Sequence, residues 1–392
     1  MSSVIVSDFG VMLGKTSERL VVRGPRPRLE MVEGGPQLFL ALDLPARPPL
    51  RVVTSDGLKT PAVPLRRPKT GNGGNGAGPR TKPEQVELPL FQVSEIILTG
   101  GGISISTDLI EECCERGIPL SFLTRSGQPF AMLSSPMLTA TVLTRREQMA
   151  AYGDARGLEL AKAIVRGKLG NQAALLKYFG KYLKTADPAA FERLVGAVRG
   201  IEARRREVDG VAGERVDDAR PVLLALEGGA GRQYWTGVRA LLEDHASFET
   251  REHRGAPDAV NSALNYGYGI LYTQVWGALM NAGLEPFAGF VHVDRPGKPS
   301  LVLDLIEEFR QPIVDRAVIA ALTKGVKVET REGLLTDESR RTVAGAVLER
   351  LESEAGFRGR RHRLKSVIQI QARNLASYLR GGEPYRAFSF KW

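Results

Sequence analysis

Short apolar or alternating segments fill the first third of the chain, and Gly, Pro and Asp residues separate them. Their sequences are VIVSDFGVML, RLVVRG, QLFLAL, LRVVTS, SEIILTG, GISIST and IPLSFLT. Short apolar runs and a period of two residues are typical of β-strands, so we predict a mainly β domain over residues 1–145. One helix should interrupt it, because Thr107 and Asp108 precede LIEECCERG, in which Gly117 supplies a stop signal.

The pattern changes near residue 152 to long stretches with a period of about 3.6 residues. Gly and Pro residues punctuate these stretches, as they commonly do between helices. The predicted helices span roughly residues 154–184, 187–205, 214–244, 257–283, 301–324, 336–356 and 360–380. We therefore predict an α+β protein in which a larger, all-α domain over residues 146–392 follows the β domain. The length of 392 residues also favours two domains.

A low-complexity segment interrupts the β domain at about residues 66–84. Its sequence, RRPKTGNGGNGAGPRTKPE, is rich in Gly, Pro and basic residues and has almost nothing to bury. Such a composition predicts a flexible insertion. Its basic residues could touch DNA, although a solvated loop is the simpler interpretation.

The composition is that of a globular protein with polyanionic partners. The chain is 43% hydrophobic and 25% charged, and its formal net charge is +10. Lys and Arg bind nucleic acid by displacing the counterions condensed on phosphates. No apolar run approaches the roughly 18 residues of a membrane-spanning helix, and the N-terminal MSSVIVSDFG lacks the features of a signal peptide. We expect a cytoplasmic protein that has no membrane partner.

The two cysteines, Cys113 and Cys114, are neighbours in sequence and poorly placed to bridge each other. We expect both to be reduced. Two cysteines alone do not make a zinc site, which normally needs three or four ligands. A metal in this protein must therefore be held mainly by carboxylates and histidine.

Glu227 lies in the strongly apolar helical stretch PVLLALEGGAGRQYW. A carboxylate that faces the interior must be paired, protonated or bound to a metal. Gly228 and Gly229 follow it, and their small size lets another backbone or a phosphate come close. The simpler alternative is that Arg232 or Arg239 neutralises Glu227 in a salt bridge.

His292 ends an apolar segment and precedes a loop that contains Pro and Gly. In the helix predicted to start near residue 300, Asp304 shares a face with Glu307 and Glu308, and like charges crowded in this way need a compensating cation. Together with Glu227, these side chains offer oxygen ligands and one imidazole. Such a set suits Mg²⁺ or Mn²⁺ and leaves open positions for phosphate and water.

Several motifs carry a resemblance to a known family. They are LEGGAGRQYW around Glu227, NYGYGILY over residues 265–272 and GFVHVDRPGKPSLVLDLIEEFR over residues 289–310. The stretches AKAIVRGKLGNQAALL, QARNLASYLRGGEPYRAF and LTGGGISIST add to them. All resemble parts of the CRISPR-associated spacer-acquisition integrase, a metal-dependent DNA endonuclease. The resemblance covers almost the whole chain apart from the insertion.

This resemblance implies a catalytic site in the helical domain, where Glu227, His292 and Glu307 hold Mg²⁺ or Mn²⁺ and Asp304 takes the adjacent acidic position. Many relatives carry aspartate where Glu307 stands, and the neighbouring Glu308 leaves the third ligand open, although we favour Glu307. The implied reaction is attack of a protospacer 3′-hydroxyl on a phosphodiester of the CRISPR repeat. The family also implies a homodimer formed largely through the β domains and a small partner, the second universal CRISPR adaptation protein.

Basic residues are the candidate contacts with DNA. A dense basic run over residues 358–365 opens the last predicted helix, where Arg358, Arg361 and Lys365 would share one side. Arg232 and Lys298 lie close along the chain to the expected metal ligands and join this set. The alternative for the basic run is a solvated surface.

Two other functions fit the same residues. A structure-specific nuclease that acts on branched DNA in repair would use the same metal chemistry. A non-catalytic scaffold that binds nucleic acid would keep Glu227, His292 and Glu307 in salt bridges, and Lys298 and Arg310 could neutralise the acidic residues near them.

Overall fold

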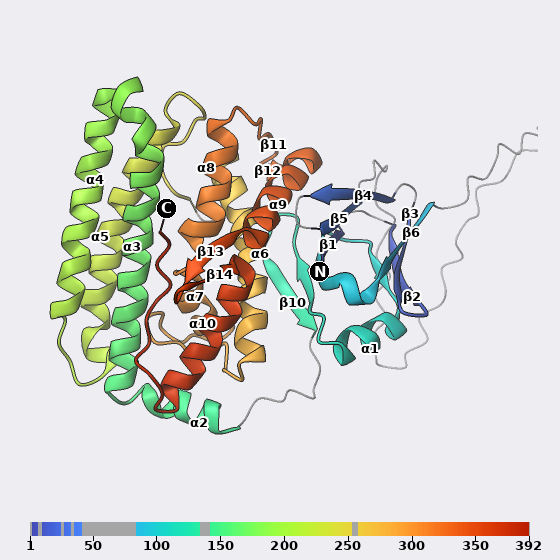
Figure 1. The fold of residues 1–392 in the computed structure, drawn as a ribbon, viewed down its shortest axis with the longest axis horizontal. Helices are drawn as coiled ribbons and strands as arrows, with labels where there is room; N and C mark the ends of the chain where they lie inside the picture. The colour runs from blue at the N-terminus through green and yellow to red at the C-terminus, as the bar shows by residue number, and fades with distance from the viewer. Residues whose placement is uncertain are drawn as a thin grey trace, which may run out of the picture.

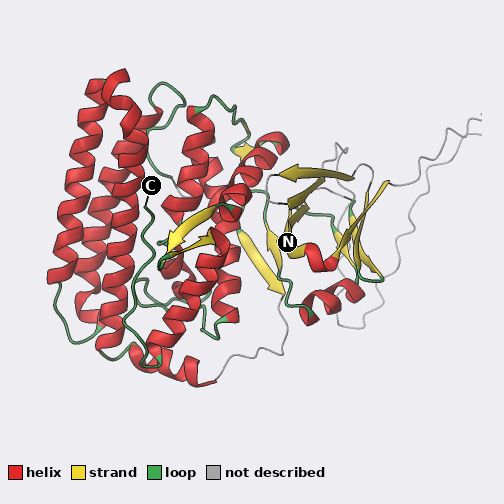
Figure 2. Ribbon diagram, in the orientation of Figure 1, coloured by secondary structure: helices red, strands yellow, loops and turns green. Residues whose placement is uncertain are grey.

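The computed structural model of the protein describes residues 2–6, 10–24, 27–32, 35–40, 84–133, 142–252 and 258–391. Strands gather in the N-terminal part and helices in the C-terminal part, and the two parts lie beside each other (Figure 1, Figure 2). This arrangement confirms the predicted α+β fold. The predicted strand LRVVTS and nearly all of the insertion expected at about residues 66–84 lie outside the described residues, and only Glu84 belongs to a described strand.

Two sheets form the N-terminal part. The larger has the strand order β10-β9-β7-β1-β5-β4, with parallel pairing from β9 to β5 and antiparallel pairing at both edges. Its strands are β1 (Ser2–Val6), β4 (Pro27–Val32), β5 (Gly35–Leu40), β7 (Val93–Thr99), β9 (Leu120–Leu123) and β10 (Pro129–Leu133). The smaller has the order β6-β3-β2-β8. Its strands are β2 (Met12–Thr16), β3 (Arg19–Gly24), β6 (Glu84–Pro89) and β8 (Ser104–Ile105).

A shared apolar core joins the two sheets and the helix α1 (Thr107–Glu115). Val4 of β1 and Val22 of β3 are buried in it, and α1 contributes Leu109 and Cys113. The helix lies where the sequence predicts it. Cys113 and Cys114 are both free, as expected.

The sequence pattern does not predict β4, β6 and β10, and all three are edge strands. β4 has the sequence PRLEMV and β6 has EQVELP, so Pro and Glu interrupt the apolar alternation in both. An edge strand pairs on one side only and tolerates Pro and charged residues. Its sequence therefore carries a weaker strand signal than that of a central strand.

The long helices α3, α4 and α5 pack against one another, and α6 packs against α9 and α10 (Figure 1). The first helices are α2 (Val142–Ala151), α3 (Ala155–Ala186), α4 (Pro188–Glu207), α5 (Val216–Leu242) and α6 (Ala259–Asn281). The later ones are α7 (Ser300–Ile306), α8 (Arg316–Thr323), α9 (Asp337–Glu352) and α10 (Leu364–Leu379). None of the helices in the described ranges is both long and apolar enough to cross a membrane.

Local capping fixes where α3 and α4 begin. Asp154 accepts a hydrogen bond from the backbone N–H of Arg156, 2.8 Å away, and Asp187 accepts one from Ala190 at 3.0 Å. Pro188 occupies the first turn of α4, where its missing N–H costs no hydrogen bond. These caps place the two helix starts next to the predicted ones.

The continuous helix predicted over residues 301–324 is wrong in its middle. α7 ends at Ile306, a tighter turn follows, and a π-helical segment (Arg310–Asp315) leads into α8. Pro312 lies in this segment and has no N–H to donate, which disfavours a regular α-helix there. The break places Glu307 at the end of α7 and turns the residues after it in a new direction.

The C-terminal part is also not all-α, which corrects the prediction. The hairpin β13 (Glu354–Phe357) and β14 (Arg360–Arg363) replaces the expected end of one helix and start of the next. Its turn uses Arg358 and Gly359, whose φ angles are +49° and +78°. A second short hairpin joins β11 (Thr330–Arg331) to β12 (Leu334–Leu335).

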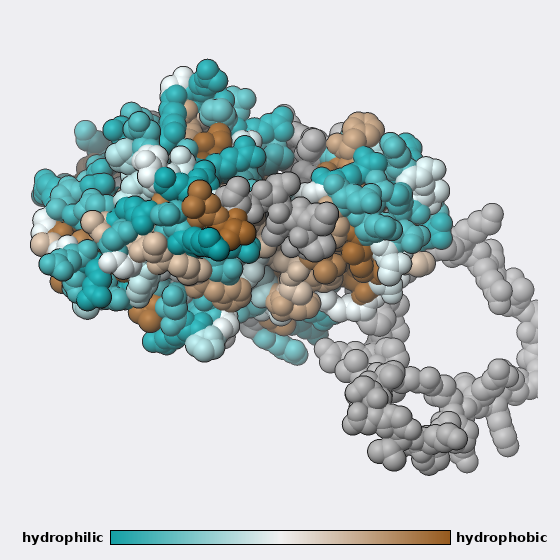
Figure 3. Space-filling view, turned by 90° about the horizontal axis from the view of Figure 1, so that it is seen from below, coloured by the Kyte–Doolittle hydropathy of each residue, from teal (hydrophilic) through white to brown (hydrophobic). Residues whose placement is uncertain are grey.

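The β and helical parts meet along α6. Gly269 of α6 lies against the backbone of Gly127, so close that an added Cβ would sit 1.6 Å from the Gly127 carbonyl oxygen. Gln274 donates a hydrogen bond to Glu95 of β7. A groove of about 1000 Å³ opens beside this contact, with Phe130 among its apolar residues. The view from below shows apolar side chains where the β part borders the helical part (Figure 3).

Candidate active site

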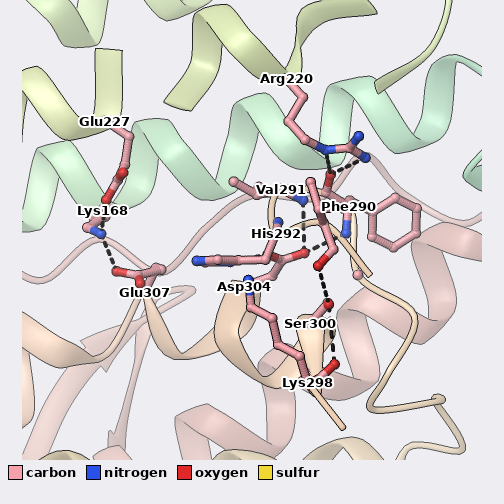
Figure 4. A network of polar contacts seen from close by, with 12 residues as sticks. Lys168, Arg220, Glu227, Phe290, Val291, His292, Lys298, Ser300, Asp304 and Glu307 are labelled. Atoms are coloured by element: carbon pink, nitrogen blue, oxygen red, sulfur yellow. Dashed lines mark hydrogen bonds and ion pairs between the residues drawn. The ribbon is translucent and has the colours of Figure 1, made fainter. Parts of the chain in front are cut away.

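Three charged side chains from distant parts of the sequence meet inside the helical part (Figure 4). Lys168 extends from α3, Glu227 from α5 and Glu307 from the end of α7. The Lys168 ammonium contacts Glu227 Oε1 and lies 2.6 Å from Glu307 Oε2. The structure thus brings Glu227 and Glu307 to a common centre, with a lysine between them.

Lys168 is the residue that the sequence analysis missed. Ile164, Asn171 and Leu175, which flank it at spacings of four, three and seven residues, are all buried, so Lys168 occupies the inward stripe of α3. A lysine on such a stripe needs a buried counter-charge, and this was the available signal. Burial alone would lower the pKa of Lys168, but Glu307 and Glu227 outweigh it and raise this pKa above its usual value.

Glu307 is ionised between two cations. Arg310 Nη2 lies 3.5 Å from Glu307 Oε1, on the opposite oxygen from the Lys168 contact. Burial alone would raise the pKa of Glu307, but Arg310, Lys168 and His292 lower it to about 2. The Arg310 guanidinium also lies 4.9 Å from the ring centroid of Tyr268, which holds it in place.

His292 is oriented by Asp304. Asp304 Oδ1 accepts hydrogen bonds from the backbone N–H of His292 at 2.9 Å and from its ring Nδ1 at 2.7 Å. Oδ2 accepts from the backbone N–H groups of Phe290 at 2.6 Å and Val291 at 3.0 Å. In a neutral imidazole, a proton on Nδ1 that is donated to this carboxylate would leave Nε2 as the nitrogen available to a metal. Asp304 is therefore a positioning residue, and the imidazole extends from it toward the Glu307 side (Figure 4).

Glu308 points into a different pocket from Glu307. Its carboxylate accepts hydrogen bonds from Gln371 Nε2 at 2.8 Å, Tyr385 Oη at 2.5 Å and the backbone N–H of Phe388 at 2.7 Å. Burial raises its pKa to about 7, although these hydrogen bonds act in the opposite direction. The expected crowding of residues 304, 307 and 308 around one cation is wrong, because the break after α7 separates the three carboxylates.

The donor set suits a hard divalent cation, although its described side chains are not yet arranged around a common metal position. Across the described ranges, no three His, Cys, Asp or Glu side chains are grouped closely enough to hold a metal. The Lys168 ammonium instead balances Glu227 and Glu307. Glu307 Oε2 is buried and contacts this ammonium without hydrogen-bond geometry. Mg²⁺ and Mn²⁺ take ligands of this kind: an ionised, buried oxygen that can accept a further contact, a second carboxylate and an imidazole nitrogen.

Of the two glycines after Glu227, Gly229 faces the neighbouring helix. A Cβ on Gly229 would lie 2.5 Å from the Nε of Arg204, so this position leaves room for the Arg204 side chain of α4 against α5. Glu227 is paired with Lys168 and not with Arg232 or Arg239, the partners considered from sequence. Arg239 pairs instead with Glu249, at 3.1 Å.

Comparison with known proteins identifies the family. The sequence pattern described as CRISPR associated protein Cas1 matches residues 79–349, more than half of the chain. The chain belongs to the Cas1 family. The matched Cas1 range contains Lys168, Glu227, His292 and Glu307, whereas Arg358 lies beyond it.

Named Cas1 relatives agree over most of their length. The CRISPR-associated endonuclease Cas1 1 of Archaeoglobus fulgidus is 38% identical over 308 residues, which cover 76% of this chain and 89% of that protein. The protein of the same name from Francisella tularensis subsp. novicida is 33% identical over 320 residues, covering 80% of this chain and 93% of that protein. The family assignment therefore does not depend on one short motif.

Solved structures share the Cas1 fold. A casposase bound to integration product superimposes with a TM-score of 0.70 at 19% identity, covering 99% of this chain and 93% of that chain. A CAS1 protein from Thermotoga maritima has a TM-score of 0.65 at 17% identity, covering 99% of this chain and 100% of the other. At these identities the likeness concerns the fold alone.

The candidate DNA contacts of this Cas1 chain occupy several elements. Arg358 is exposed in the turn between β13 and β14, Arg361 lies on β14 and pairs with Glu354 at 2.9 Å, and Lys365 on α10 pairs with Glu352. The expected shared helix face for residues 358, 361 and 365 is therefore wrong.

The two remaining candidates lie elsewhere. Arg232 is exposed on α5, and Lys298 is partly buried in the loop before α7. Lys298 pairs through its backbone with Arg295, in an isolated bridge that shapes this loop. DNA contact stays a prediction for both residues.

Proposed function

We propose that this chain is a divalent-metal-dependent DNA endonuclease and strand-transfer integrase that joins protospacer 3′-hydroxyl ends into a CRISPR repeat array. The observation that carries the proposal is the convergence of Glu227 and Glu307, with His292 held beside them, in a member of the Cas1 family. Relatives named CRISPR-associated endonucleases support the nuclease activity. The casposase bound to integration product supports strand transfer on the same fold.

Glu227, His292 and Glu307 would hold Mg²⁺ or Mn²⁺. When bound, the cation polarises the scissile phosphate and stabilises the charge that develops on it. Glu307 is already ionised because Arg310 and Lys168 lower its pKa, so it needs no deprotonation before it binds a cation. Asp304 would keep the proton of a neutral His292 on Nδ1 and would leave Nε2 as the ligand atom.

The proposal includes contacts with DNA and with other proteins. Arg232, Lys298, Arg358, Arg361 and Lys365 would contact the phosphates of the protospacer and the repeat. The chain would act as a homodimer in the cytoplasm. A solved Cas6-RT-Cas1--Cas2 complex, with a TM-score of 0.66 at 18% identity, covers 99% of this chain and 36% of that one. This likeness supports a small second adaptation protein as partner.

An integration assay tests the proposed reaction. Purified full-length protein and its small partner are mixed with a duplex ending in 3′-hydroxyls and a plasmid bearing the repeat, with Mn²⁺ or with EDTA. We expect joining only with the metal. Glu227→Ala and His292→Ala should lower strand transfer by about 100-fold or more while changing DNA affinity little.

The same assay separates the alternatives. Cleavage of branched DNA without joining to the repeat would favour a repair nuclease. DNA binding with no metal-dependent cleavage or joining would favour a non-catalytic scaffold. Full strand transfer by Glu227→Ala and His292→Ala would show that the site lies elsewhere.

A further inference from the structure

A positive charge already occupies the space between the two proposed carboxylate ligands. The Lys168 ammonium contacts Glu227 and lies 2.6 Å from Glu307 Oε2. Only 11% of the Lys168 side chain is exposed, against 27% for Glu227 and 7% for Glu307. The pair of contacts is therefore an interior charge centre with little competition from water.

The backbone that carries Lys168 is held firmly. Gly167 packs so closely on the C-terminal segment that an added Cβ would lie 2.4 Å from the Cβ of Ala387. Asn171 Nδ2 donates hydrogen bonds to the carbonyl oxygens of Glu308 and Phe388, each at 2.9 Å. Movement of the ammonium must therefore come from the lysine side chain, which has four rotatable bonds, and not from α3.

The charges at this centre balance without a metal. Glu227 and Glu307 carry two negative charges, and Lys168 and Arg310 carry two positive charges close to them. A divalent cation bound to both carboxylates would take the position of the ammonium and would repel it. The two cations therefore compete for the same pair of oxygens.

We propose that Lys168 holds the metal position in the metal-free protein and leaves it when a divalent cation binds. This inference rests on the proposed function, because it takes Glu227 and Glu307 as the metal ligands. The ammonium holds the two carboxylates together before the metal binds. It also lowers the metal affinity, since every incoming cation must displace it.

Replacement of the lysine tests the competition. Full-length wild type, Lys168→Gln and Lys168→Arg are titrated with Mn²⁺ by calorimetry, and their melting temperatures are measured with and without Mn²⁺. Lys168→Gln should bind Mn²⁺ roughly tenfold more tightly than wild type. Without metal it should also have a lower melting temperature, and Mn²⁺ should raise that temperature by more than in the wild type, because the two carboxylates have lost the ammonium between them. Lys168→Arg keeps the charge and should not gain affinity.

Lys162 provides a matched control on the same helix. It pairs with Glu159 at 3.1 Å, and 13% of its side chain is exposed. Lys162→Gln should change neither the Mn²⁺ affinity nor the gain in melting temperature with Mn²⁺. An equal gain of affinity in this variant would attribute the effect to net charge and overturn the proposal.

A measurement on the wild type needs no variant and covers the case in which Lys168→Gln does not fold. Acetylation of lysines with acetic anhydride is followed by mass spectrometry, with and without Mn²⁺. Lys168 should become more reactive when Mn²⁺ binds, while Lys162 should not change. If Mn²⁺ binds and the reactivity of Lys168 does not change, the displacement of Lys168 by the metal is disproved. The same follows if folded Lys168→Gln binds Mn²⁺ no more tightly than the wild type. Neither result contradicts the proposed function. Absence of Mn²⁺ binding in every protein, with DNA present or not, would overturn both.

Discussion

Asp304 holds His292 by two hydrogen bonds at once, one to its backbone N–H and one to its ring Nδ1. The second oxygen of the same carboxylate holds the two residues before His292. One side chain thus fixes both the loop that carries the imidazole and the tautomer of the ring. Such support matters because a proposed ligand is useful only if its free nitrogen points at the metal.

Asp304→Asn should weaken metal binding and stability together. The amide nitrogen cannot accept hydrogen bonds, so buried backbone donors lose their partner at a cost of about 1–3 kcal/mol. The Mn²⁺ affinity should fall by about 10–100-fold, as is typical when the support of a ligand is removed. Calorimetry and urea unfolding check both effects. Asp294 is the control, because it is exposed and accepts a single bond from Gly289, and Asp294→Asn should be close to neutral.

Glu307→Gln and Glu308→Gln should have different effects, although the residues are neighbours. We expect Glu307→Gln to lower Mn²⁺ affinity by about 100-fold or more, because a proposed ligand loses its charge. Glu308→Gln should leave Mn²⁺ affinity nearly unchanged but cost about 1–3 kcal/mol of unfolding free energy, because Tyr385 and Phe388 donate to different carboxylate oxygens and the amide nitrogen of Gln cannot accept either hydrogen bond. Mn²⁺ titration and urea unfolding of both variants measure this. Loss of Mn²⁺ binding in Glu308→Gln alone would transfer the ligand role to Glu308.

The stability of the helical part should depend on pH through Asp315. This carboxylate is buried and accepts hydrogen bonds from Tyr234, at 2.7 Å, and from Tyr268. Burial raises its pKa from 3.8 to about 6, against the effect of the two hydroxyls. A raised carboxyl pKa means that the folded state binds the proton more tightly than the unfolded state. The contribution to stability is therefore present below about pH 4 and is lost as the pH rises to about 6.

Asp315→Asn removes this titration. Relative to the variant, the wild type should lose up to about 3 kcal/mol of unfolding free energy between pH 4 and pH 6, with a constant difference above about pH 7. Urea unfolding of both proteins across this range measures the difference. A difference independent of pH would contradict the assignment.

Gly269→Ala should destabilise the contact between the β part and α6. The added methyl would lie 1.6 Å from the carbonyl oxygen of Gly127, and the backbone there cannot yield cheaply. We expect a loss of about 1–3 kcal/mol or more in unfolding free energy. Gly277→Ala on the same helix is the control, because nothing lies within 4 Å of its added methyl. It should gain roughly 0.5–1 kcal/mol from helix propensity, and urea unfolding compares the two.

The sequence predicts central elements better than edges and breaks. Central strands and long helices carry strong periodic patterns, so the fold class and the starts of α3 and α4 were predicted correctly. The sequence pattern does not predict the edge strands β4, β6 and β10, because a strand that pairs on one side only tolerates residues that weaken the strand pattern. The break after α7 was missed although Pro312 marks it, because Pro can also lie in a kinked but continuous helix.

Part of the candidate site could be predicted for a similar reason. The sequence marks Glu227 because a carboxylate in an apolar helix needs a partner, and the family resemblance adds His292 and Glu307. Lys168 satisfies the same condition on α3 but was overlooked, since lysines are common on helix surfaces and its inward position shows only when the whole stripe is considered. Which acidic residue binds which partner depends on the turn after α7, and local sequence does not specify that turn.

The hydrogen bonds from Gln371, Tyr385 and Phe388 to Glu308 have a consequence for biosynthesis. A ribosome releases the polypeptide from the N-terminus, so α3, α5 and α7 emerge long before residue 388. Until that residue is free, the Glu308 carboxylate lacks the backbone donor that completes its pocket. The surroundings of Glu307 are therefore complete only after residue 388 has left the ribosome, later than the three helices that carry the charged side chains of the candidate site.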